Sequence, residues 1–248
     1  MRLHRFFIEE HLRNKKDFTL YDTDIIHQLK DVFRLRQGDQ LILLDNTGFE
    51  YIAEIVVLAK GKGEIKIIDT SAALNIPEKE VWLFASLIKK DNYEWILEKC
   101  TELGVSHFVP MLSDRTEKKD LNIERAHKII KEASEQSGRG VMPTIHDVRD
   151  FKDALTHAQE QNMKFLAFHV GGEHFDKEKV LNRKSTLEKS LGIPQEKNAY
   201  GIFVGPEGGW SDKEVNLFKE HGVLVYSLGK QVLRTETAAI AISSILLL

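Results

Sequence analysis

The feature that most constrains the fold is an alternation of short apolar runs and amphipathic segments over the last two thirds of the chain. The apolar runs predict strands at residues 81–85, 107–111, 165–169, 200–204 and 223–227. Apolar positions spaced by three and four predict helices at residues 91–103 and 122–138. Strands that alternate with helices are typical of a largely parallel sheet covered on both faces. We therefore expect an α/β domain over residues 73–248.

The first 72 residues carry a different pattern and are expected to form a separate domain. Apolar runs at 41–44 and 49–58 are separated by the turn residues 45–48, and residues 64–68 alternate polar and apolar side chains. Residues 22–29 can form one short helix between the first strands. This arrangement indicates a small β-barrel of the RNA-binding type, followed by a short linker that ends near Pro77.

Composition restricts the class of function. The net charge of the 248 residues is −3, so any RNA surface must be a local basic patch. Cys100 is the only cysteine, which excludes an internal disulfide and a cysteine-based zinc cluster and favours a reducing, cytosolic setting. We expect no signal peptide, because residues 1–16 carry charge throughout, and no membrane span, because the apolar stretch 238–248 is shorter than the roughly 20 residues that a bilayer requires. We expect no metal site, because no carboxylate–histidine spacing indicates one.

The most informative loop reads GPEGGWS and covers Gly205 to Ser211. It follows an apolar strand, and Ser211 and Glu214 have the spacing of a capping box at the start of a helix. Its three glycines permit positive φ angles and a close approach of the backbone to a ligand. The loop has no basic residue and contains Glu207, so it suits a sulfonium, a ribose or an adenine amine better than a polyphosphate. The alternative is a tight structural turn without a ligand.

A second loop has the same position relative to the next strand. It reads LGKQVLRTETA from Leu228 to Ala238, and Thr235 can cap the apolar helix that follows. Ligands of open α/β sheets bind beyond the carboxyl ends of strands. We therefore expect the two loops to enclose one ligand, with Arg234 and Glu236 at a helix N-terminus. The alternative for this pair is a surface ion pair of little energetic value.

The sequences GPEGGWSDKE and LGKQVLRTETA together resemble the ribosomal RNA small subunit methyltransferase E family, within the knotted SPOUT class. The resemblance extends to EKCTELGV at 98–105, EASEQSGR at 132–139, VFRL at 32–35 and the N-terminal Arg2, Arg5 and Phe6, and so covers essentially the whole chain. At 114–117 the chain reads DRTE where the family more often has Ser-Glu-Arg-Ser, so no RNA role is assigned to Arg115.

The resemblance implies a fold and an activity that the residue patterns alone do not reach. It implies a PUA-like β-barrel over residues 1–72 and a SPOUT-type α/β domain with a deep trefoil knot over residues 73–248. Such knots are rare exceptions to normal chain topology. It further implies a cytoplasmic homodimer that uses S-adenosylmethionine to methylate N3 of a uridine in 16S ribosomal RNA of the small subunit.

The same resemblance implies the residues that bind the methyl donor. His169 is included among them, although a histidine in an apolar strand more often belongs to the core, as expected for His107. The donor-binding candidates are His169, Gly205, Pro206, Glu207, Gly208, Gly209, Leu228, Gly229, Val232, Leu233, Thr235, Thr237 and Ala238.

Chemistry at N3 of uracil suggests three catalytic candidates. This nitrogen carries a proton at neutral pH, so a base or a cation that stabilises the uracil anion should assist transfer. Glu236 is the candidate base, and Arg139 and Arg234 are the candidate cations. The alternative for Arg139 is a cation placed at a helix C-terminus by the helix dipole. RNA contacts are expected from Arg2, Arg5, Phe6, Arg34, Arg36, Lys89 and Lys90. Phe6 would stack on a base, and its alternative is a core position, because an aromatic residue in a first strand more often belongs to the core.

Three other functions stay open at this point. A ribose 2′-O methyltransferase of the same class would use the same donor loops. An RNA-binding protein without catalysis would keep the fold and lose donor binding. An α/β enzyme for a small phosphorylated metabolite is disfavoured by the acidic first loop.

Overall fold

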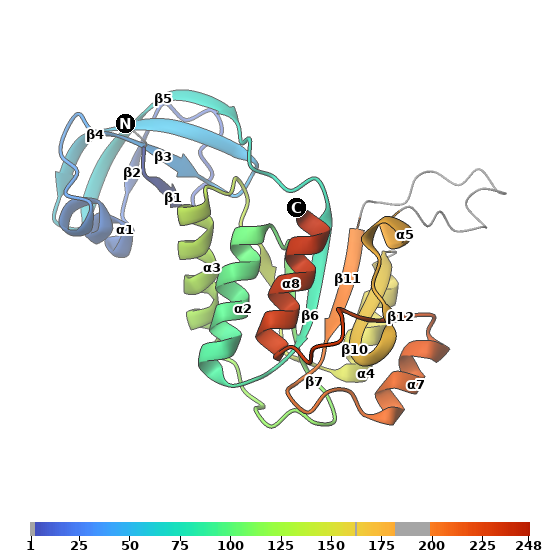
Figure 1. Cartoon of the computed structure of the whole chain (residues 1–248). Helices are drawn as coiled ribbons and strands as arrows, with labels where there is room; N and C mark the ends of the chain where they lie inside the picture. The colour runs from blue at the N-terminus through green and yellow to red at the C-terminus, as the bar shows by residue number, and fades with distance from the viewer. Residues whose placement is uncertain (1–2, 162, 182–198) are drawn as a thin grey trace. The chain divides into compact units, whose positions relative to one another are not determined.

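The computed structural model describes residues 3–161, 163–181 and 199–248, and they form two compact units. Unit 1 comprises residues Met1–Ile76 together with Lys131–Met142, and unit 2 comprises Pro77–Ile130 and Pro143–Leu248. Both are drawn in Figure 1. In the described part of the chain, each helix is too short or too polar to span a bilayer.

Unit 1 is built on a five-stranded sheet with the strand order β1-β3-β4-β5-β2. Strand β1 runs parallel to β3, and the other neighbours are antiparallel. Its core contains Phe6, Leu12, Leu29, Leu43 and Tyr51. The elements are β1 (Arg5–Phe7), β2 (Asp17–Leu20), α1 (Thr23–His27), the π-helix η1 (Gln28–Val32), β3 (Gln40–Leu44), β4 (Phe49–Ala59) and β5 (Lys62–Ala72).

Unit 2 is built on a parallel sheet with the strand order β12-β10-β11-β6-β7-β8, and β9 also pairs with β7. The alternation of strands and helices seen in the sequence therefore does produce a parallel α/β fold. The strands are β6 (Glu80–Ser86), β7 (His107–Leu112), β8 (Thr144–Ile145), β9 (Arg149–Asp150), β10 (Lys164–His174), β11 (Ala199–Val204) and β12 (Leu224–Ser227). The helices are α2 (Lys90–Leu103), α3 (Ile123–Ser137), α4 (Phe151–Glu160), α5 (Lys177–Leu181), α7 (Asp212–Glu220) and α8 (Thr235–Leu247).

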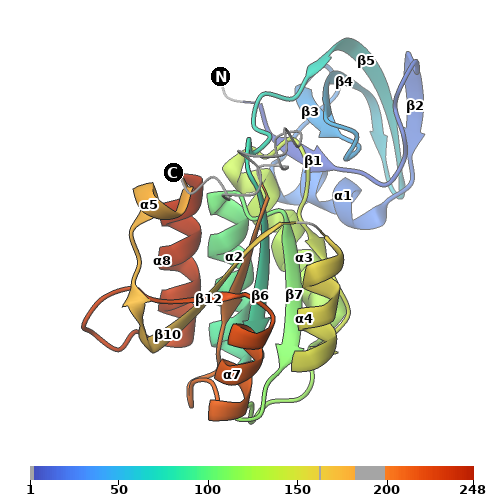
Figure 2. The same cartoon turned by 90° about the vertical axis from the view of Figure 1, so that its right-hand side faces the viewer.

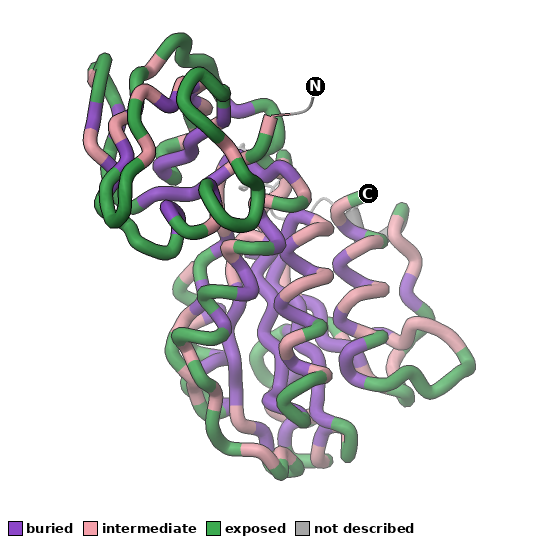
Figure 3. The backbone as a smooth tube through the Cα atoms, turned by 90° about the vertical axis from the view of Figure 1, so that its left-hand side faces the viewer, coloured by how far each residue is buried: buried purple, intermediate pink, exposed green. Residues whose placement is uncertain are grey.

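Helices cover both faces of this sheet (Figure 1 and Figure 2). Residues of α2, α3 and α8 pack on the face that presents Val81, Leu83 and Ala85 of β6. Residues of α4 and α7 pack on the opposite face with Trp82 and Phe84. Because successive strand residues point to opposite faces, a strand buried on both sides is apolar throughout. Figure 3 shows this continuous burial along the central strands.

Local sequence signals explain where two of these helices begin and end. Gly104 ends α2 in a left-handed conformation with φ of 110°, and the backbone N–H of Val105 donates to the carbonyl of Cys100. Ser211 and Glu214 form the expected capping box at the start of α7. Both features were predicted from the sequence, whereas α4 was not, although its buried positions 151, 154, 155 and 158 have helical spacing. The trefoil knot that the resemblance implies stays a prediction.

Candidate functional site

A pocket opens in unit 2 at the carboxyl ends of β11 and β12, beside the irregular middle part of β10 that begins after Phe168. This is the position at which open parallel sheets bind ligands. The two glycine-containing loops that were singled out in the sequence both contribute to it. The pocket is lined by Phe168, His169, Val170, Val204, Gly205, Pro206, Glu207, Gly209, Trp210, Ser227, Leu228, Gln231, Val232, Leu233, Arg234, Thr235 and Ala238.

The glycines of the first loop have distinct physical roles. A Cβ atom on Gly205 would lie 3.0 Å from Cε2 of Trp210, whose indole N–H donates to the carbonyl of Phe168 at 2.9 Å. Gly209 has φ of 67°, and its N–H donates to the carbonyl of Pro206 at 2.8 Å. A Cβ atom on Gly208 would lie 3.1 Å from Cβ of Arg115. A side chain at Gly205 or Gly208 would therefore have to displace Trp210 or Arg115 by a few tenths of an ångström, whereas a side chain at Gly209 would strain the backbone.

The second loop is tied to the first by one buried hydrogen bond. The hydroxyl of Thr235 donates to the carbonyl of Gly205 at 3.0 Å. Thr235 is thus the first residue of α8 and not its cap; the N-cap is Arg234, whose side chain makes no capping hydrogen bond. The expectation that Thr235 caps α8 was wrong, because its hydroxyl bonds to the neighbouring loop instead of to its own helix. This bond holds the two loops at one pocket.

The structure brings most of the donor-binding candidates together. His169, Gly205, Pro206, Glu207, Gly209, Leu228, Val232, Leu233, Thr235 and Ala238 line the pocket, together with Arg234. Gly208, Gly229 and Thr237 belong to the same loops but are not among the lining residues. The sequence analysis missed Phe168, Val170, Val204, Trp210, Ser227 and Gln231. Each is adjacent to a predicted residue or lies at a strand end, which is the signal that could have identified them.

A third loop, between β7 and α3, holds the first one in place. The hydroxyl of Ser211 donates to the Asp114 carboxylate at 2.6 Å, and the backbone N–H of Asp114 donates to Glu214 at 2.9 Å. The Nη1 atom of Arg115 donates to the carbonyl of Gly208 at 2.8 Å. Asp114 and Arg115 were not predicted as site residues. Their contacts show that they support the shape of the loop rather than line the pocket.

Glu236, the candidate base, occupies the first turn of α8, where a carboxylate is favoured by the helix dipole. Its side chain is buried, and its Oε2 atom accepts no hydrogen bond from the described residues. Glu236 is not among the residues that line the pocket. A base has to come within hydrogen-bonding distance of the proton that it removes. The catalytic role of Glu236 therefore stays a prediction that this geometry does not favour.

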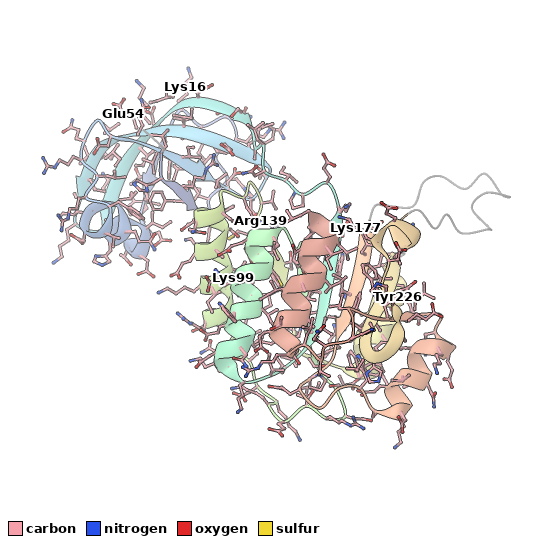
Figure 4. The ribbon with its side chains drawn as sticks, in the orientation of Figure 1. Lys16, Glu54, Lys99, Arg139, Lys177 and Tyr226 are labelled. Atoms are coloured by element: carbon pink, nitrogen blue, oxygen red, sulfur yellow. The ribbon has the colours of Figure 1, made fainter. Side chains whose placement is uncertain are left out.

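Arg139, a candidate cation, follows the last turn of α3 and belongs to unit 1 (Figure 4). It is buried, its Nε atom donates to the carbonyl of Val141 at 3.0 Å, and burial lowers its pKa to about 10. A guanidinium with a pKa near that value is still protonated at neutral pH. Arg139 thus keeps its charge inside the protein, as either a structural or a catalytic cation requires.

The candidate RNA contacts have very different environments. Arg34, Arg36, Lys89 and Lys90 are exposed, as phosphate contacts must be. Arg5 is paired with Glu50, its Nη1 atom lying 2.7 Å from Oε1. Phe6 is 1% exposed and belongs to the core of unit 1, so the expectation that it stacks on a base was wrong. Arg2 lies outside the described residues.

The pocket offers a surface that fits an adenosyl sulfonium. Its walls are mainly apolar, from residues such as Val204, Leu228 and Val232, which suits an adenine ring. It also presents one carboxylate, Glu207, and one guanidinium, Arg234, which can balance a cationic and an anionic group of the same ligand. In the described residues, no group of three or more His, Cys, Asp or Glu side chains is arranged to hold a metal ion.

Comparison with known families gives two matches that together span most of the chain. Residues 75–247 match an RNA methyltransferase domain, and residues 20–68 match an RNA methyltransferase PUA domain. The ribosomal RNA small subunit methyltransferase E of Bacillus subtilis is 33% identical, over 98% of this chain and 96% of its own length. The protein of the same name from Rickettsia conorii is 29% identical over 100% and 97%.

Solved structures with the methyl donor bound are similar over the full length. A ribosomal RNA small subunit methyltransferase E from Neisseria gonorrhoeae, bound to S-adenosylmethionine, has 28% identity and a TM-score of 0.79, covering 98% of this chain and 96% of its own. A methyltransferase from Legionella pneumophila in complex with the same cofactor has 25% identity and a TM-score of 0.82, covering 99% and 97%.

Proposed function

The chain belongs to the RNA methyltransferase family that includes ribosomal RNA small subunit methyltransferase E, and on this premise we propose that it methylates N3 of a uridine in 16S ribosomal RNA. The methyl donor is S-adenosylmethionine. One observation carries the proposal for this chain: two loops from separate strand ends, joined through Thr235 and Gly205, form a single pocket with an apolar wall and one group of each charge.

Different residues of the pocket are assigned to different parts of the donor. When bound, the donor would supply a methyl group on a positively charged sulfur, and this sulfur would be the leaving group of an in-line displacement. We assign the apolar wall to the adenine ring, Glu207 to the cationic part and Arg234 to the carboxylate end. The remaining task of the protein is to hold the acceptor nitrogen in line with the transferred group, because orientation supplies much of the rate acceleration in such reactions.

Removal of the N3 proton leaves a negative charge on the uracil that a protein cation can stabilise. Arg234 and Arg139 are the two candidate cations. Because Arg234 is assigned to the donor carboxylate, Arg139 is the candidate that we test for the uracil anion. We expect Arg139→Ala to lower the single-turnover rate at least tenfold, about 1.4 kcal/mol of barrier, with unchanged donor affinity. Arg139→Lys, which keeps the charge, serves as the matched control. If Arg139→Ala folds normally and reacts at the wild-type rate, its role is structural.

The identity of the product tests the proposed reaction. Small ribosomal subunits from cells lacking this protein are incubated with the protein and S-adenosylmethionine, and the digested RNA is analysed by mass spectrometry. We expect N3-methyluridine. A ribose-methylated nucleoside would support the 2′-O methyltransferase instead. Failure of the donor to raise the melting temperature would support an RNA-binding protein without catalysis, because a ligand that binds only the native state stabilises it.

Two assembly properties belong to the same proposal. We propose that the protein acts as a homodimer in the cytoplasm. Sedimentation equilibrium measures its oligomeric state directly.

The exposed cations Arg34, Arg36, Lys89 and Lys90 are assigned to RNA phosphates. Phosphate contacts release counterions, so RNA affinity should fall steeply as salt concentration rises. An affinity that does not change with salt would remove this assignment.

A further inference from the structure

The segment from Gln28 to Arg36 in unit 1 has two unusual backbone features in succession. Residues Gln28–Val32 form a π-helix, closed by a hydrogen bond from the N–H of Phe33 to the carbonyl of Gln28. Arg34 then adopts a left-handed conformation with φ of 55°. π-Helical turns are rare and frequently occur at functional sites, and a non-glycine residue in this conformation costs on the order of 1 kcal/mol. The surrounding structure therefore imposes an unfavourable backbone here.

The consequence of this backbone is an exposed aromatic ring at a cavity. Phe33 is 38% exposed, while its ring is held in place by His4, with ring centroids 4.2 Å apart, and by the edge contact with Phe6 at 5.5 Å. Phe33 and Val32 line a cavity of about 560 Å³ in unit 1. Pockets for small organic groups commonly have volumes of about 300–1,000 Å³. The cavity is thus large enough for a planar heterocycle.

The last turns of α3, which belong to unit 1, supply polar groups to the same cavity. Glu135 and Gln136 are among its lining residues. One carboxylate oxygen of Glu135 accepts the backbone N–H of Phe7 at 2.9 Å, and burial raises the pKa of this carboxyl group to about 7. A partly buried carboxyl group that faces a cavity is stabilised by a ligand with N–H donors.

Charge is distributed differently outside the cavity. Lys30, Arg34 and Arg36 are exposed on the same segment, and none of them forms an ion pair with any residue that the structure describes. Glu132 and Glu135 line the cavity, and the one arginine in its lining, Arg5, is paired with Glu50, so an anion is disfavoured as the occupant. The arrangement fits a ligand whose neutral, planar part enters while its charged part stays outside. A single-stranded nucleic acid has this character, and aromatic side chains flanked by cations are the usual means of binding it.

We propose that this cavity takes one unpaired base of the RNA substrate, stacked on Phe33 with its N–H edge toward Glu135, while Arg34 and Arg36 contact the adjoining phosphates. The inference rests on the proposed function only in that the chain binds RNA. It adds a base-binding site that is separate from the donor pocket and assigns it the role of holding the substrate strand.

The test compares two RNAs that differ only in their bases. Binding of the full-length protein to a short fluorescein-labelled single-stranded RNA of mixed sequence is measured beside binding to an abasic strand of the same length. Stacking on one aromatic ring contributes enough that Phe33→Ala should weaken binding to the RNA at least fivefold. Binding to the abasic strand should not change. Phe33→Tyr keeps the ring and should bind like the wild type.

Matched variants separate stacking from general surface effects. Phe49 is also in unit 1 and is 37% exposed, but it does not line the cavity, so Phe49→Ala should leave both affinities unchanged. Arg34→Ala should weaken the RNA and the abasic strand equally, because it removes a phosphate contact. Equal affinity of wild type and Phe33→Ala for the RNA would overturn the proposal. An equal loss on both strands in Phe33→Ala would overturn it too.

A failure here is distinguishable from a failure of the proposed function. Donor binding by calorimetry and the methylated nucleoside by mass spectrometry depend on the pocket in unit 2. If those measurements succeed while the wild type shows no preference for RNA over the abasic strand, the base-binding site is wrong and the methyltransferase function stands.

Discussion

The two ends of the parallel sheet in unit 2 are built in opposite ways. At the carboxyl ends, two loops with glycines in left-handed or extended conformations leave an open pocket. At the amino ends, Trp82 is stacked on His107 and His146, with ring centroids 3.8 Å and 4.9 Å apart, and meets His157 edge to face at 5.6 Å. His107 and His169 look alike in the sequence, since each lies in an apolar strand. His107 begins β7 at the amino end of the sheet, whereas His169 lies within β10 beside the carboxyl ends of β11 and β12. Position in the sheet therefore decides which histidine fills space and which one faces the pocket.

The environment of His107 agrees with a structural role. Its Nδ1 atom lies 3.3 Å from Nε2 of His146, and its Nε2 atom lies 3.4 Å from the Glu80 carboxylate. Burial lowers the pKa of His107 to about 4, and the pKa values of His146 and His157 are lowered by burial as well. Neutral, stacked rings of this kind fill the end of the sheet. His169, by contrast, is half-buried beside the Gly209 turn, with Cε1 at 4.0 Å from the position of a Cβ on that glycine.

The largest effect on stability is expected from removing the Trp82 ring at the amino ends of the strands. Trp82 is 6% exposed, so Trp82→Ala should lower the free energy of unfolding by about 3–5 kcal/mol, through lost burial and a cavity. Chemical denaturation measures this change. Trp95, which is 53% exposed on α2, is the matched control, and Trp95→Ala should change stability by less than about 0.5 kcal/mol. Similar losses in both variants would contradict the structural role of the stack.

The histidines at the amino ends of the strands should also make the free energy of unfolding depend on pH. In the unfolded chain a histidine titrates near pH 6.5, whereas folded His107 has a pKa of about 4. Between these values the unfolded chain binds a proton that the folded chain does not, so the free energy of unfolding should fall as pH is lowered, by on the order of 2 kcal/mol. Denaturation curves from pH 7 to pH 4 measure this fall. His107→Phe keeps a ring on Trp82 and should flatten the dependence.

In unit 1, Glu135 has the opposite effect on the pH dependence of the free energy of unfolding. Its contribution has to be removed before the effect of His107 can be measured. The pKa of Glu135 is raised to about 7, so its contribution to stability is present below pH 4.5 and is lost as pH rises toward 7. The comparison of wild type and His107→Phe is therefore best made in a Glu135→Gln background. A pH dependence that is the same with and without His107 would show that other groups control acid stability.

At the carboxyl ends of the strands, where the pocket lies, backbone conformation should control donor binding. Gly209 and Gly222 have φ of 67° and 70°, and each has open space around its Cβ position, but only Gly209 lines the pocket. A branched side chain strains either backbone. Gly209→Val should weaken binding of S-adenosylmethionine tenfold or more, about 1.4 kcal/mol, while Gly222→Val should keep the wild-type affinity. Calorimetry on folded variants measures both, and a wild-type affinity of Gly209→Val would contradict the assignment of the pocket.

The smallest effect is expected from the loop that supports the pocket from outside. Arg115→Ala removes one exposed hydrogen bond to the carbonyl of Gly208 and should weaken donor binding by a factor of about three to ten, since such a bond contributes about 0.5–1.5 kcal/mol. Arg125→Ala, at an exposed arginine paired with Glu94 away from the pocket, is the control. If both variants bind the donor like the wild type, the first loop keeps its shape without Arg115.

Much of the donor pocket could be predicted because its signals are local. Glycines after an apolar strand, and Ser211 three residues before Glu214, specify a turn and a helix start whatever the rest of the chain does. What could not be predicted is which atoms face the ligand. The hydroxyl of Thr235 bonds to Gly205, 30 residues earlier in the chain, and this pairing replaced the expected helix cap.

Aromatic residues in unit 1 show the same limit. Phe6 and Phe33 both appear in segments that resemble the family, and Phe6 was the candidate for stacking on a base. Phe6 is buried in the core of unit 1, as is its neighbour Phe7, whereas Phe33, which follows the π-helix, is 38% exposed. Periodicity and turn chemistry act over a few residues, so the sequence was sufficient to predict the α/β class, the position of the two ligand loops, the end of α2 and the start of α7. The burial of Phe6 and Glu236, the partial burial of Glu135 and the different roles of His107 and His169 could be read only from the folded structure, because exposure depends on which distant segments pack against a side chain.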